Sequence, residues 1–403
     1  MGSNTSPPPK TWVETPCIRS AALSRAAGCN IYLKLETLQP SSSFKSRGIG
    51  NMMSTALLYH GLSKPIHFYC SSGGNAGLAC VTAANTLQRP ATIVVPLLTS
   101  ELMVEKLKLL GADVVQIGQH WLEADTYLRE ELLAKDEDGV YVPPFDHEDV
   151  WEGNASMIGE IEVQMREEGG YEAVVCSVGG GGMFCGIMQG LERNGRLEST
   201  EKVKVLAMET IGADSLNTSI RNGELTRIPA ITSIATSLGA TQVAQRAWEW
   251  SQREEVTSYT LTDAEAAMAC VHFADDERII VESACGASIA TAYNGTLHSV
   301  LFPHLSDDEF ARKNVVIIER LPRGRERGQE VPPEKCEGAD SKVDEEEGAQ
   351  KAPFIMHNET KHKHQEKPEC DDDTAVPPKP MIGTMHEGEV ERQLGEFGKV
   401  VQI

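Results

Sequence analysis

The 403-residue sequence lacks any apolar run of 18 residues, so we expect no membrane-spanning helix. Its opening segment, MGSNTSPPPK, has no apolar core and does not predict a secretory signal peptide. Basic residues are in deficit, and the formal net charge is −22. This balance argues against nucleic-acid binding, because phosphate contacts need clustered lysine and arginine. We therefore expect neither a nucleic acid nor a membrane as a partner.

Paired cysteines are also missing. None of the ten cysteines forms a C-x-x-C pair or a His/Cys spacing typical of a metal site. Free thiols are typical of the cytosol, where disulfides are rare. We therefore expect a cytoplasmic protein whose thiols are reduced, including Cys17, Cys70, Cys80, Cys176 and Cys270.

What the sequence does contain is alternation. Short apolar runs rich in branched residues, bounded by Gly, Pro or Asn, are separated by helical patterns such as 75–88 and 100–111. This alternation predicts an α/β fold with parallel sheets and helices on both faces. The expected strands lie at 31–36, 65–70, 91–96, 113–118, 173–178, 204–209 and 314–319.

Both ends of the chain differ from this pattern. Residues 1–10 predict a disordered leader. Beyond Ile318 the sequence is rich in acidic residues, Pro, Gly, Lys and His, with no sustained period. We expect an acidic, low-complexity and mostly disordered tail at 321–403.

Two glycine-rich turns indicate anion binding. CSSGGNAGLA (70–79) and SVGGGGMFCG (177–186) each follow an expected strand and open a helix. Open α/β sheets bind ligands at the edge formed by the carboxyl ends of their strands. Free backbone amides at the start of a helix bind anions. Four consecutive glycines are costly in chain entropy, and a phosphate that meets backbone amides directly explains them.

The main alternative interpretation of the second turn, 177–186, is a dinucleotide-binding site. G-x-G-x-x-G would need glycine where Phe184 or Cys185 stands, although Glu209 ends the next strand where a ribose-binding acid would lie. No Walker lysine pattern occurs either. A third candidate turn, VESACGASIA (281–290), is weaker and is equally compatible with close helix–sheet packing.

The two glycine-rich turns suggest a chemical role for Lys45. It stands in SSSFKSRGIGN (41–51), among small hydroxyl residues. A reactive amine, a phosphate cradle and a second anion-binding loop are what pyridoxal phosphate and an amino-acid substrate require.

Several motifs together resemble the serine/threonine dehydratases, pyridoxal-phosphate enzymes of the tryptophan-synthase-β fold. They are KLETLQPSSSFKSRG, SSGGNAG, SVGGGG, AMETIGADS and VESACGAS, in that order between about Thr11 and Ile318. PPFDHEDVWEGNASM (143–157) is more similar to eukaryotic L-serine dehydratases than to biosynthetic threonine deaminases.

The resemblance implies two parallel-sheet α/β domains with the cofactor between them. The large domain would comprise 11–42 and 146–320, and the small substrate-loop domain 43–145. It also implies a homodimer and, near the phosphate loop, a monovalent cation such as K⁺. The matching positions for the cation are Glu209, Ala213, Ser215, Leu238 and Ala240.

The resemblance also assigns roles to single residues. Lys45 would bind the cofactor covalently and act as the catalytic base, with Phe44 packed on the cofactor ring. Asn75 would hydrogen-bond the ring hydroxyl. The substrate carboxylate would lie against Ser72, Gly73, Asn75 and Ala76, and the phosphate against Gly179, Gly180, Gly181, Gly182 and Met183.

The chain departs from the family pattern at one position. Glu319 stands where the family places a Cys or Ser against the pyridine nitrogen, and the glycine pair that follows is missing. A carboxylate there would keep the nitrogen protonated and strengthen the electron sink. Two alternatives stay open: Glu319 does not reach the ring, or the sequence beyond Ile318 comes from an altered reading frame or a retained intron.

The implied reaction is β-elimination of L-serine to pyruvate and ammonia, and of L-threonine to 2-oxobutanoate and ammonia. One alternative is a catalytically impaired relative that binds the cofactor but has an altered C-terminus. Another is a β-replacement enzyme on the same fold.

Overall fold

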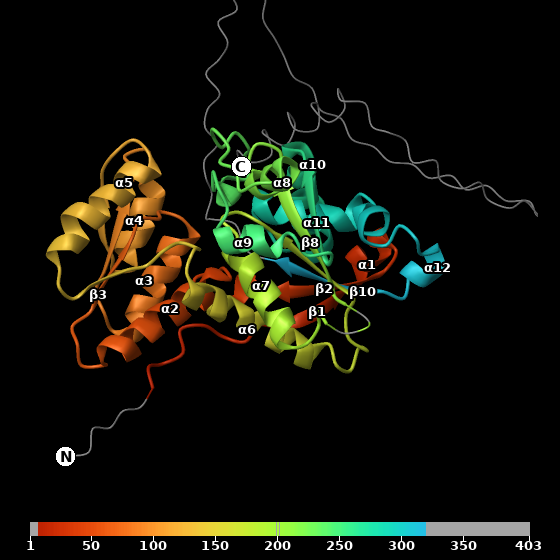
Figure 1. The fold of residues 1–403 in the computed structure, drawn as a ribbon, viewed down its shortest axis with the longest axis horizontal. Coiled ribbons are helices and arrows are strands. Elements are labelled where there is room, and N and C mark those ends of the chain that lie inside the picture. Colours follow the sequence, from red (N-terminus) through yellow and green to blue (C-terminus); the bar gives the residue numbers. More distant parts are fainter. Residues whose placement is uncertain (1–6, 199, 201, 320–403) are drawn as a thin grey trace, which may run out of the picture. The chain divides into compact units, whose positions relative to one another are not determined.

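The structure is a computed structural model, and Figure 1 shows its course along the chain. The described residues are 7–198, 200 and 202–319. They fall within a single compact unit. Of the expected leader only residues 7–10 are described, and they form neither helix nor strand. The expected tail at 321–403 lies outside the described residues.

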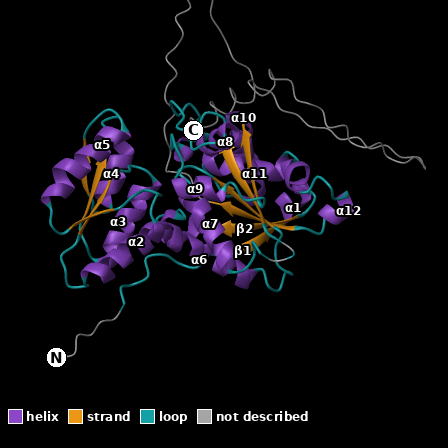
Figure 2. Cartoon of the chain, in the orientation of Figure 1, coloured by secondary structure: helices purple, strands orange, loops and turns teal. Residues whose placement is uncertain are grey.

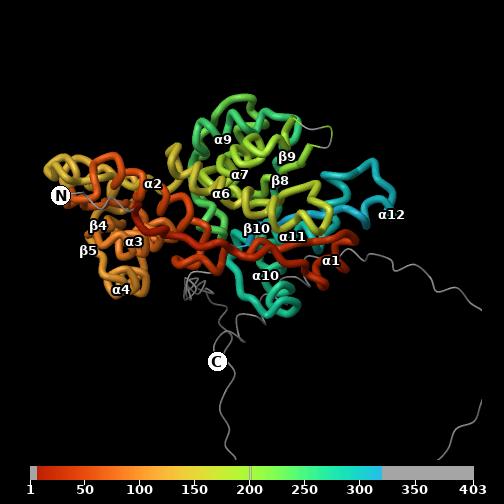
Figure 3. The backbone as a smooth tube through the Cα atoms, turned by 90° about the horizontal axis from the view of Figure 1, so that it is seen from below, coloured from red at the N-terminus to blue at the C-terminus, as the bar shows by residue number. Residues whose placement is uncertain are grey.

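Among the described residues, the larger of two sheets has six strands in the order β1-β2-β10-β7-β8-β9. All neighbouring strands are parallel except β1 and β2, which are antiparallel. The last strand in sequence, β10, lies between two early ones, and Figure 3 shows it returning beside the N-terminal segment. The strands are β1 (Cys17–Ser20), β2 (Asn30–Leu35), β7 (Ala173–Ser177), β8 (Lys204–Thr210), β9 (Val256–Leu261) and β10 (Asn314–Glu319).

The smaller sheet has four strands, all parallel, in the order β5-β4-β3-β6. It is built from residues between 67 and 141. The division of the chain into domains at 43 and 145 stays a prediction. The strands are β3 (His67–Cys70), β4 (Ala91–Val95), β5 (Asp113–Gln116) and β6 (Gly139–Tyr141).

Helices connect the strands and pack against both sheets (Figure 2). Most are α-helices, and short 3₁₀ or π turns interrupt the loops. The α-helices are α1 (Ala21–Ala27), α2 (Lys45–His60), α3 (Asn75–Leu87), α4 (Glu101–Leu109), α5 (Trp121–Tyr127), α6 (Glu148–Gln164), α7 (Gly182–Arg193), α8 (Ser215–Asn222), α9 (Gln245–Trp250), α10 (Asp263–Glu277), α11 (Ser283–Tyr293) and α12 (Asp307–Phe310). The short turns are η1 (Glu36–Leu38), η2 (Leu128–Leu132), η3 (Leu133–Lys135), η4 (Thr236–Leu238) and η5 (Leu297–Leu301).

Strand β10 shows why the larger sheet forms. Its residues are buried throughout, as expected for a parallel strand covered on both faces. Val315 and Ile317 join the apolar cluster formed with α11, whereas Val316 and Ile318 join the one formed with α6 and α7. Alternation with a period of two therefore gives each face of the sheet its own core.

Every strand expected from the sequence is present, which confirms the α/β class. Three strands were missed: β1, β6 and β9. Strand β1 is mostly exposed, β6 has only three residues, and β9 (VTSYTL) is largely polar. None of them has the continuous apolar run that predicts a buried strand.

The prediction of a third glycine turn around Gly286 was wrong. Gly286 lies inside α11, and a Cβ there would collide with the carbonyl of Ala266 and lie 2.8 Å from the Cys270 Sγ, both on α10. The glycine therefore allows close packing of two helices rather than of a helix on the sheet.

Candidate active site

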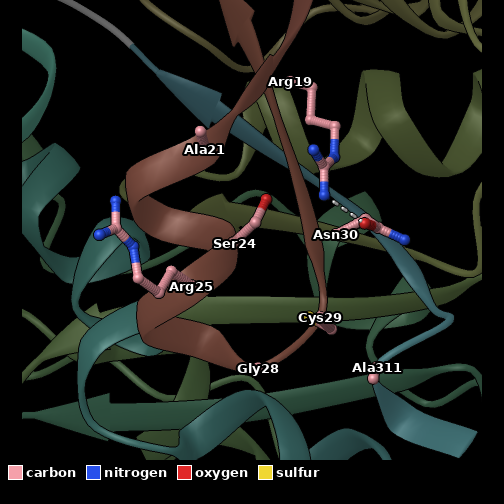
Figure 4. Close-up of a pocket in the computed structure, with 8 residues that line it drawn as sticks. All are labelled: Arg19, Ala21, Ser24, Arg25, Gly28, Cys29, Asn30 and Ala311. Atoms are coloured by element: carbon pink, nitrogen blue, oxygen red, sulfur yellow. Dashed lines mark hydrogen bonds between the residues drawn. The ribbon is translucent and has the colours of Figure 1, made fainter.

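The two glycine-rich turns expected to bind anions follow the carboxyl ends of strands, as predicted. Residues 71–74 leave β3 and enter α3, and residues 178–181 leave β7 and enter α7. Lys45 is the first residue of α2, which packs against both α3 and α6. The described pocket shown in Figure 4 is elsewhere: it is lined by Arg19 and Asn30, at the opposite, amino end of β2.

A turn of three serines, Ser41 to Ser43, precedes Lys45 and is fixed by a hydrogen bond to the first turn of the helix. Ser42 has a φ of 59°, in the left-handed region, and the Ser41 amide donates to the Ser46 Oγ at 3.0 Å. The Lys45 Nζ donates to the carbonyl oxygen of Pro144. The amine therefore points to the segment that follows β6.

That segment also touches the glycine loop. A Cβ on Gly180 would collide with the ring of Phe145, and one on Gly182 would lie 2.7 Å from the Phe145 carbonyl oxygen. Residues 144 and 145 thus connect the Lys45 amine to the loop at 179–182. Sequence reasoning did not single out Phe145, because β6, the strand that leads to it, was not expected.

The glycine loop has no room for side chains. Gly181 has a φ of +90°, and a Cβ there would lie 2.5 Å from the Cβ of Ala247. A Cβ on Gly179 would lie 3.1 Å from the Cα of Leu238. The amides in the first turn of α7 have no intrahelical acceptor, so the loop presents donors to an anion.

Phe44 and Met183 belong to one buried apolar cluster, which brings the head of α2 and the head of α7 together. Phe44 is 4% exposed, and its ring centroid lies 5.4 Å from the Lys45 Nζ. An aromatic ring beside the amine can pack against a planar ligand bound there.

The turn after β3 is supported from two sides. At its start, the Ser71 hydroxyl donates to Asp125 at 2.5 Å, and Asp125 also accepts from Tyr141 at 2.7 Å and Arg129 at 2.8 Å. Within the turn, the Gly74 amide donates to the Ser72 hydroxyl at 3.3 Å. Gly73 and Ala76 lie in the same turn and at the head of α3.

Asn75 has a partner that the sequence did not predict. Its amide Nδ2 donates to Oε1 of Glu282 at 2.8 Å, so α3 of the smaller sheet meets the start of α11. The second carboxylate oxygen of Glu282 is buried and has no hydrogen bond to any described residue. Glu282 stands in the VESACG motif, which was the available signal.

The expected cation positions begin with Glu209, the last residue but one of β8. Glu209 is fully buried and accepts the backbone amides of Leu216 at 2.9 Å and Asn217 at 2.7 Å. Burial raises its pKa to about 8, and these two amides oppose part of the rise. Ser215 has a buried hydroxyl with no hydrogen bond among the described residues. Ala213 lies in the turn between β8 and α8, Leu238 ends η4, and Ala240 follows it two residues later.

Glu319 ends β10 with 0% of its surface exposed. Neither carboxylate oxygen makes a well-formed hydrogen bond to a described residue. Burial raises its pKa to about 8; the Thr37 hydroxyl lies close enough to oppose the rise, and the charge of Glu36 adds to it.

Three further expectations have a structural outcome. Cys17, Cys70, Cys80, Cys176 and Cys270 are free thiols, as predicted. Within the described part of the chain, no helix is long and apolar enough to cross a membrane, and no cluster of three His, Cys, Asp or Glu side chains could hold a metal ion. A cation held mainly by carbonyl oxygens needs no such cluster.

Comparison with known proteins decides the family. The family described as "Pyridoxal-phosphate dependent enzyme" matches residues 10–318. The chain belongs to this family. Pyridoxal phosphate is therefore its cofactor, and the match ends at Ile318, the residue at which the motif pattern of the sequence also ends.

The family's serine-acting members include close relatives of this chain. An L-serine dehydratase of Saccharomyces cerevisiae strain AWRI1631 is 40% identical over 316 residues, covering 76% of this chain and 91% of the yeast protein. A Bos taurus protein named L-serine dehydratase/L-threonine deaminase is 43% identical over 289 residues, covering 72% and 85%. The crystal structure of a fungal L-serine ammonia-lyase from Rhizomucor miehei has a TM-score of 0.69 at 32% identity, covering 77% and 94%.

The residues present fit the family's cofactor. The loop at 179–182 has no room for side chains and leads into the start of α7, where backbone amides can bind a phosphate. The Lys45 amine is joined to that loop through residues 144 and 145.

Proposed function

We propose that this chain converts L-serine to pyruvate and ammonia, and L-threonine to 2-oxobutanoate and ammonia. The observation that carries the proposal is the connection of Lys45 through Pro144 and Phe145 to a glycine loop with no room for side chains. Relatives that share about two fifths of their sequence with this chain are named for serine and threonine.

Pyridoxal phosphate would be held from three directions. Lys45 would bind its aldehyde covalently, and Phe44 would pack against its ring. Asn75 would donate to the ring hydroxyl, and Glu319 would face the ring nitrogen. The amides of Gly179, Gly180, Gly181, Gly182 and Met183 would bind its phosphate.

The substrate would bind at the head of α3. Its carboxylate would accept hydrogen bonds from the turn formed by Ser72, Gly73, Asn75 and Ala76, at the positive end of a 13-residue helix. When bound, the cofactor supplies an electron sink for the pair left at the substrate Cα. The Lys45 amine would take the α-proton, and the β-hydroxyl would leave as water.

A spectroscopic and a product assay together test this proposal. The purified protein should show the visible absorbance of lysine-bound pyridoxal phosphate and release equal amounts of pyruvate and ammonia from L-serine. Lys45→Ala should lose both signals. Lys64→Ala, at a half-exposed lysine in a surface ion pair with Asp138, should keep both. A wild-type protein without the visible band would overturn the proposal.

Different results in the same assays identify the alternatives. Visible absorbance without pyruvate would show a catalytically impaired protein that binds the cofactor. A thioether formed when a thiol is added with serine would show β-replacement instead.

We also propose a bound monovalent cation, K⁺, at Glu209, Ala213, Ser215, Leu238 and Ala240. It is supported by a buried carboxylate whose pKa burial raises to about 8 and by the unpartnered Ser215 hydroxyl beside it. A cation there would hold the carboxylate ionised. Replacing potassium with lithium should lower turnover in the wild type, and equal rates in both salts would contradict the site.

A homodimer in the cytoplasm is proposed as well. Two large apolar side chains, Leu98 after β4 and Leu109 at the end of α4, are 78% and 87% exposed, which favours burial against a second copy. The free thiols favour a reducing compartment. Light scattering on a sizing column would measure the mass, and imaging of a tagged protein would locate it.

A further inference from the structure

Asn154 is a buried polar residue at the point where three helices meet. It lies within α6, which packs against both α2 and α7 (Figure 1), and it is 1% exposed. Lys45 begins α2, and the glycine loop at 179–182 leads into α7. One side chain of α6 is therefore placed between the helix that carries the reactive amine and the helix expected to bind the phosphate.

Glycines on both flanking helices bring backbone atoms against this side chain. A Cβ on Gly48, three residues after Lys45, would lie 2.8 Å from the Asn154 Oδ1. A Cβ on Gly186, one turn into α7, would collide with the Asn154 Cβ. Because backbone atoms cannot rotate aside as side chains do, any shift of Asn154 would move one of these helices.

The side-chain amide of Asn154 donates a hydrogen bond to the glycine loop. Its Nδ2 lies 3.0 Å from the carbonyl oxygen of Gly182. A carbonyl oxygen only accepts, so the nitrogen of the amide, and not its oxygen, must face Gly182. The peptide group that carries this carbonyl also carries the N–H of Met183, one of the expected phosphate donors. Because a trans peptide is planar, the direction of its carbonyl fixes the direction of its N–H.

An asparagine at this position is unfavourable for the fold alone. The apolar cluster shared by α6 and α7 includes Met157, Ile158 and Ile187. Asparagine is a weak helix former, and the buried Oδ1 of Asn154 has no hydrogen bond to a described residue. A buried polar atom left unpaired destabilises a fold, whereas an apolar side chain would carry no such penalty. The amide therefore indicates a task other than packing.

We infer that Asn154 is a positioning residue for the cofactor's phosphate. The inference rests on the proposed function, since it requires the phosphate to bind at 179–182. Asn154 acts through the loop: it holds the Gly182 carbonyl toward α6, so that the Met183 N–H, on the opposite side of the same peptide, is directed toward the phosphate. Through its contact with Gly48 it also keeps the helix of Lys45 at a set distance from the loop.

Pyridoxal, which has the cofactor's aldehyde but no phosphate, separates this role from packing. The dissociation constants of pyridoxal and of pyridoxal phosphate are measured by visible absorbance for the full chain as wild type, Asn154→Asp and Asn154→Ala. Asn154→Asp keeps the shape and loses the donor, and Asn154→Ala loses the donor without adding a charge. In both variants the preference for the phosphate form should fall about fivefold, as expected for one lost hydrogen bond, while the affinity for pyridoxal should change little.

Asn194→Ala is the matched control. The Asn194 Nδ2 donates to the carbonyl oxygen of Gly190 at 2.8 Å, so it makes the same kind of bond at the far end of α7. This variant should keep the wild-type preference for pyridoxal phosphate over pyridoxal, because its hydrogen bond does not reach the loop at 179–182.

Three results would overturn the inference alone. They are an equal loss of affinity for both ligands in Asn154→Ala, which would show that Asn154 only packs, an unchanged preference for the phosphate form in both variants, and failure of both variants to fold. A wild type that binds pyridoxal as tightly as pyridoxal phosphate would instead contradict phosphate binding at 179–182, and with it the proposed function.

Discussion

Arg47 and Glu36 form a two-point ion pair whose side chains are both 0% exposed. The Arg47 Nε lies 2.7 Å from one carboxylate oxygen of Glu36, and its NH2 group lies 2.8 Å from the other. Glu160 of α6 accepts from the other side of the same guanidinium at 2.6 Å. Because Arg47 follows Lys45 by two residues, this pair fixes the head of α2 to the end of β2.

Replacing Arg47 with methionine should therefore destabilise the fold strongly. It would leave Glu36 buried without its cation, and breaking such a pair costs about 3–5 kcal/mol. Arg246→Met is the matched control, because its pair with Glu249 is about half exposed and such surface pairs contribute little to stability. Denaturant unfolding measures both, and equal losses in the two variants would contradict the role assigned to Arg47.

A single methyl group at Gly180 should weaken cofactor binding. Gly180→Ala would place a Cβ against the Phe145 ring and displace the loop that is proposed to hold the phosphate. Gly159→Ala is the control: nothing lies within 4 Å of its added Cβ, and alanine is better than glycine inside α6 by roughly 1 kcal/mol. Titration with pyridoxal phosphate, followed by its visible absorbance, should show weaker cofactor binding in Gly180→Ala only. An unchanged affinity in that variant would be evidence against phosphate binding by the loop at 179–182.

Glu319 should make the cofactor-free protein less stable as pH rises. Its pKa is about 8 in the fold against an ordinary 4.5, so between these values the unfolded chain has lost a proton that the folded chain keeps. Stability then falls with increasing pH, by at most about 1.4 kcal/mol per pH unit for one group. Glu319→Gln should lose less stability than the wild type between pH 5 and pH 8, measured by thermal unfolding. If stability fell equally with pH in the wild type and in Glu319→Gln, the Glu319 carboxyl would not be protonated and buried in the fold.

Asp125 should control substrate binding through Ser71. Asp125→Asn keeps the shape but weakens acceptance from Ser71, Tyr141 and Arg129, and loss of one such bond costs about 1 kcal/mol. We expect a rise of about fivefold in KM for serine with little change in kcat or in the visible absorbance. Asp138→Asn, at a half-exposed surface pair, should leave KM unchanged. A fall in kcat alone would place Asp125 in another role.

The parts of the fold that local pattern determines were predictable. Runs such as the one at 314–319 are short, rich in β-branched residues and bounded by polar residues. The glycine turns mark where strands end. The antiparallel pairing of β1 was not predictable, because a four-residue, mostly exposed strand has no periodic signal.

The candidate site could be proposed from the sequence only where its residues are close together along the chain. Lys45 and the loop at 179–182 stand in recognisable stretches. The link from Asn75 to Glu282 spans 207 positions, and the contact of Phe145 with Gly180 depends on two separate loops meeting. Nothing in either local sequence determines such a contact, because it arises from how the sheets' loops converge.

The position of β10 has a consequence for biosynthesis. Strands β2 and β7 are not neighbours; the only strand that joins them in the described part of the larger sheet is β10, at 314–319. While the ribosome is still translating earlier codons, both strands have an unpaired edge that is open to aggregation or to chaperones. The larger sheet closes only when its last strand emerges. A nascent chain stopped before Asn314 should therefore be recovered as insoluble or chaperone-bound protein.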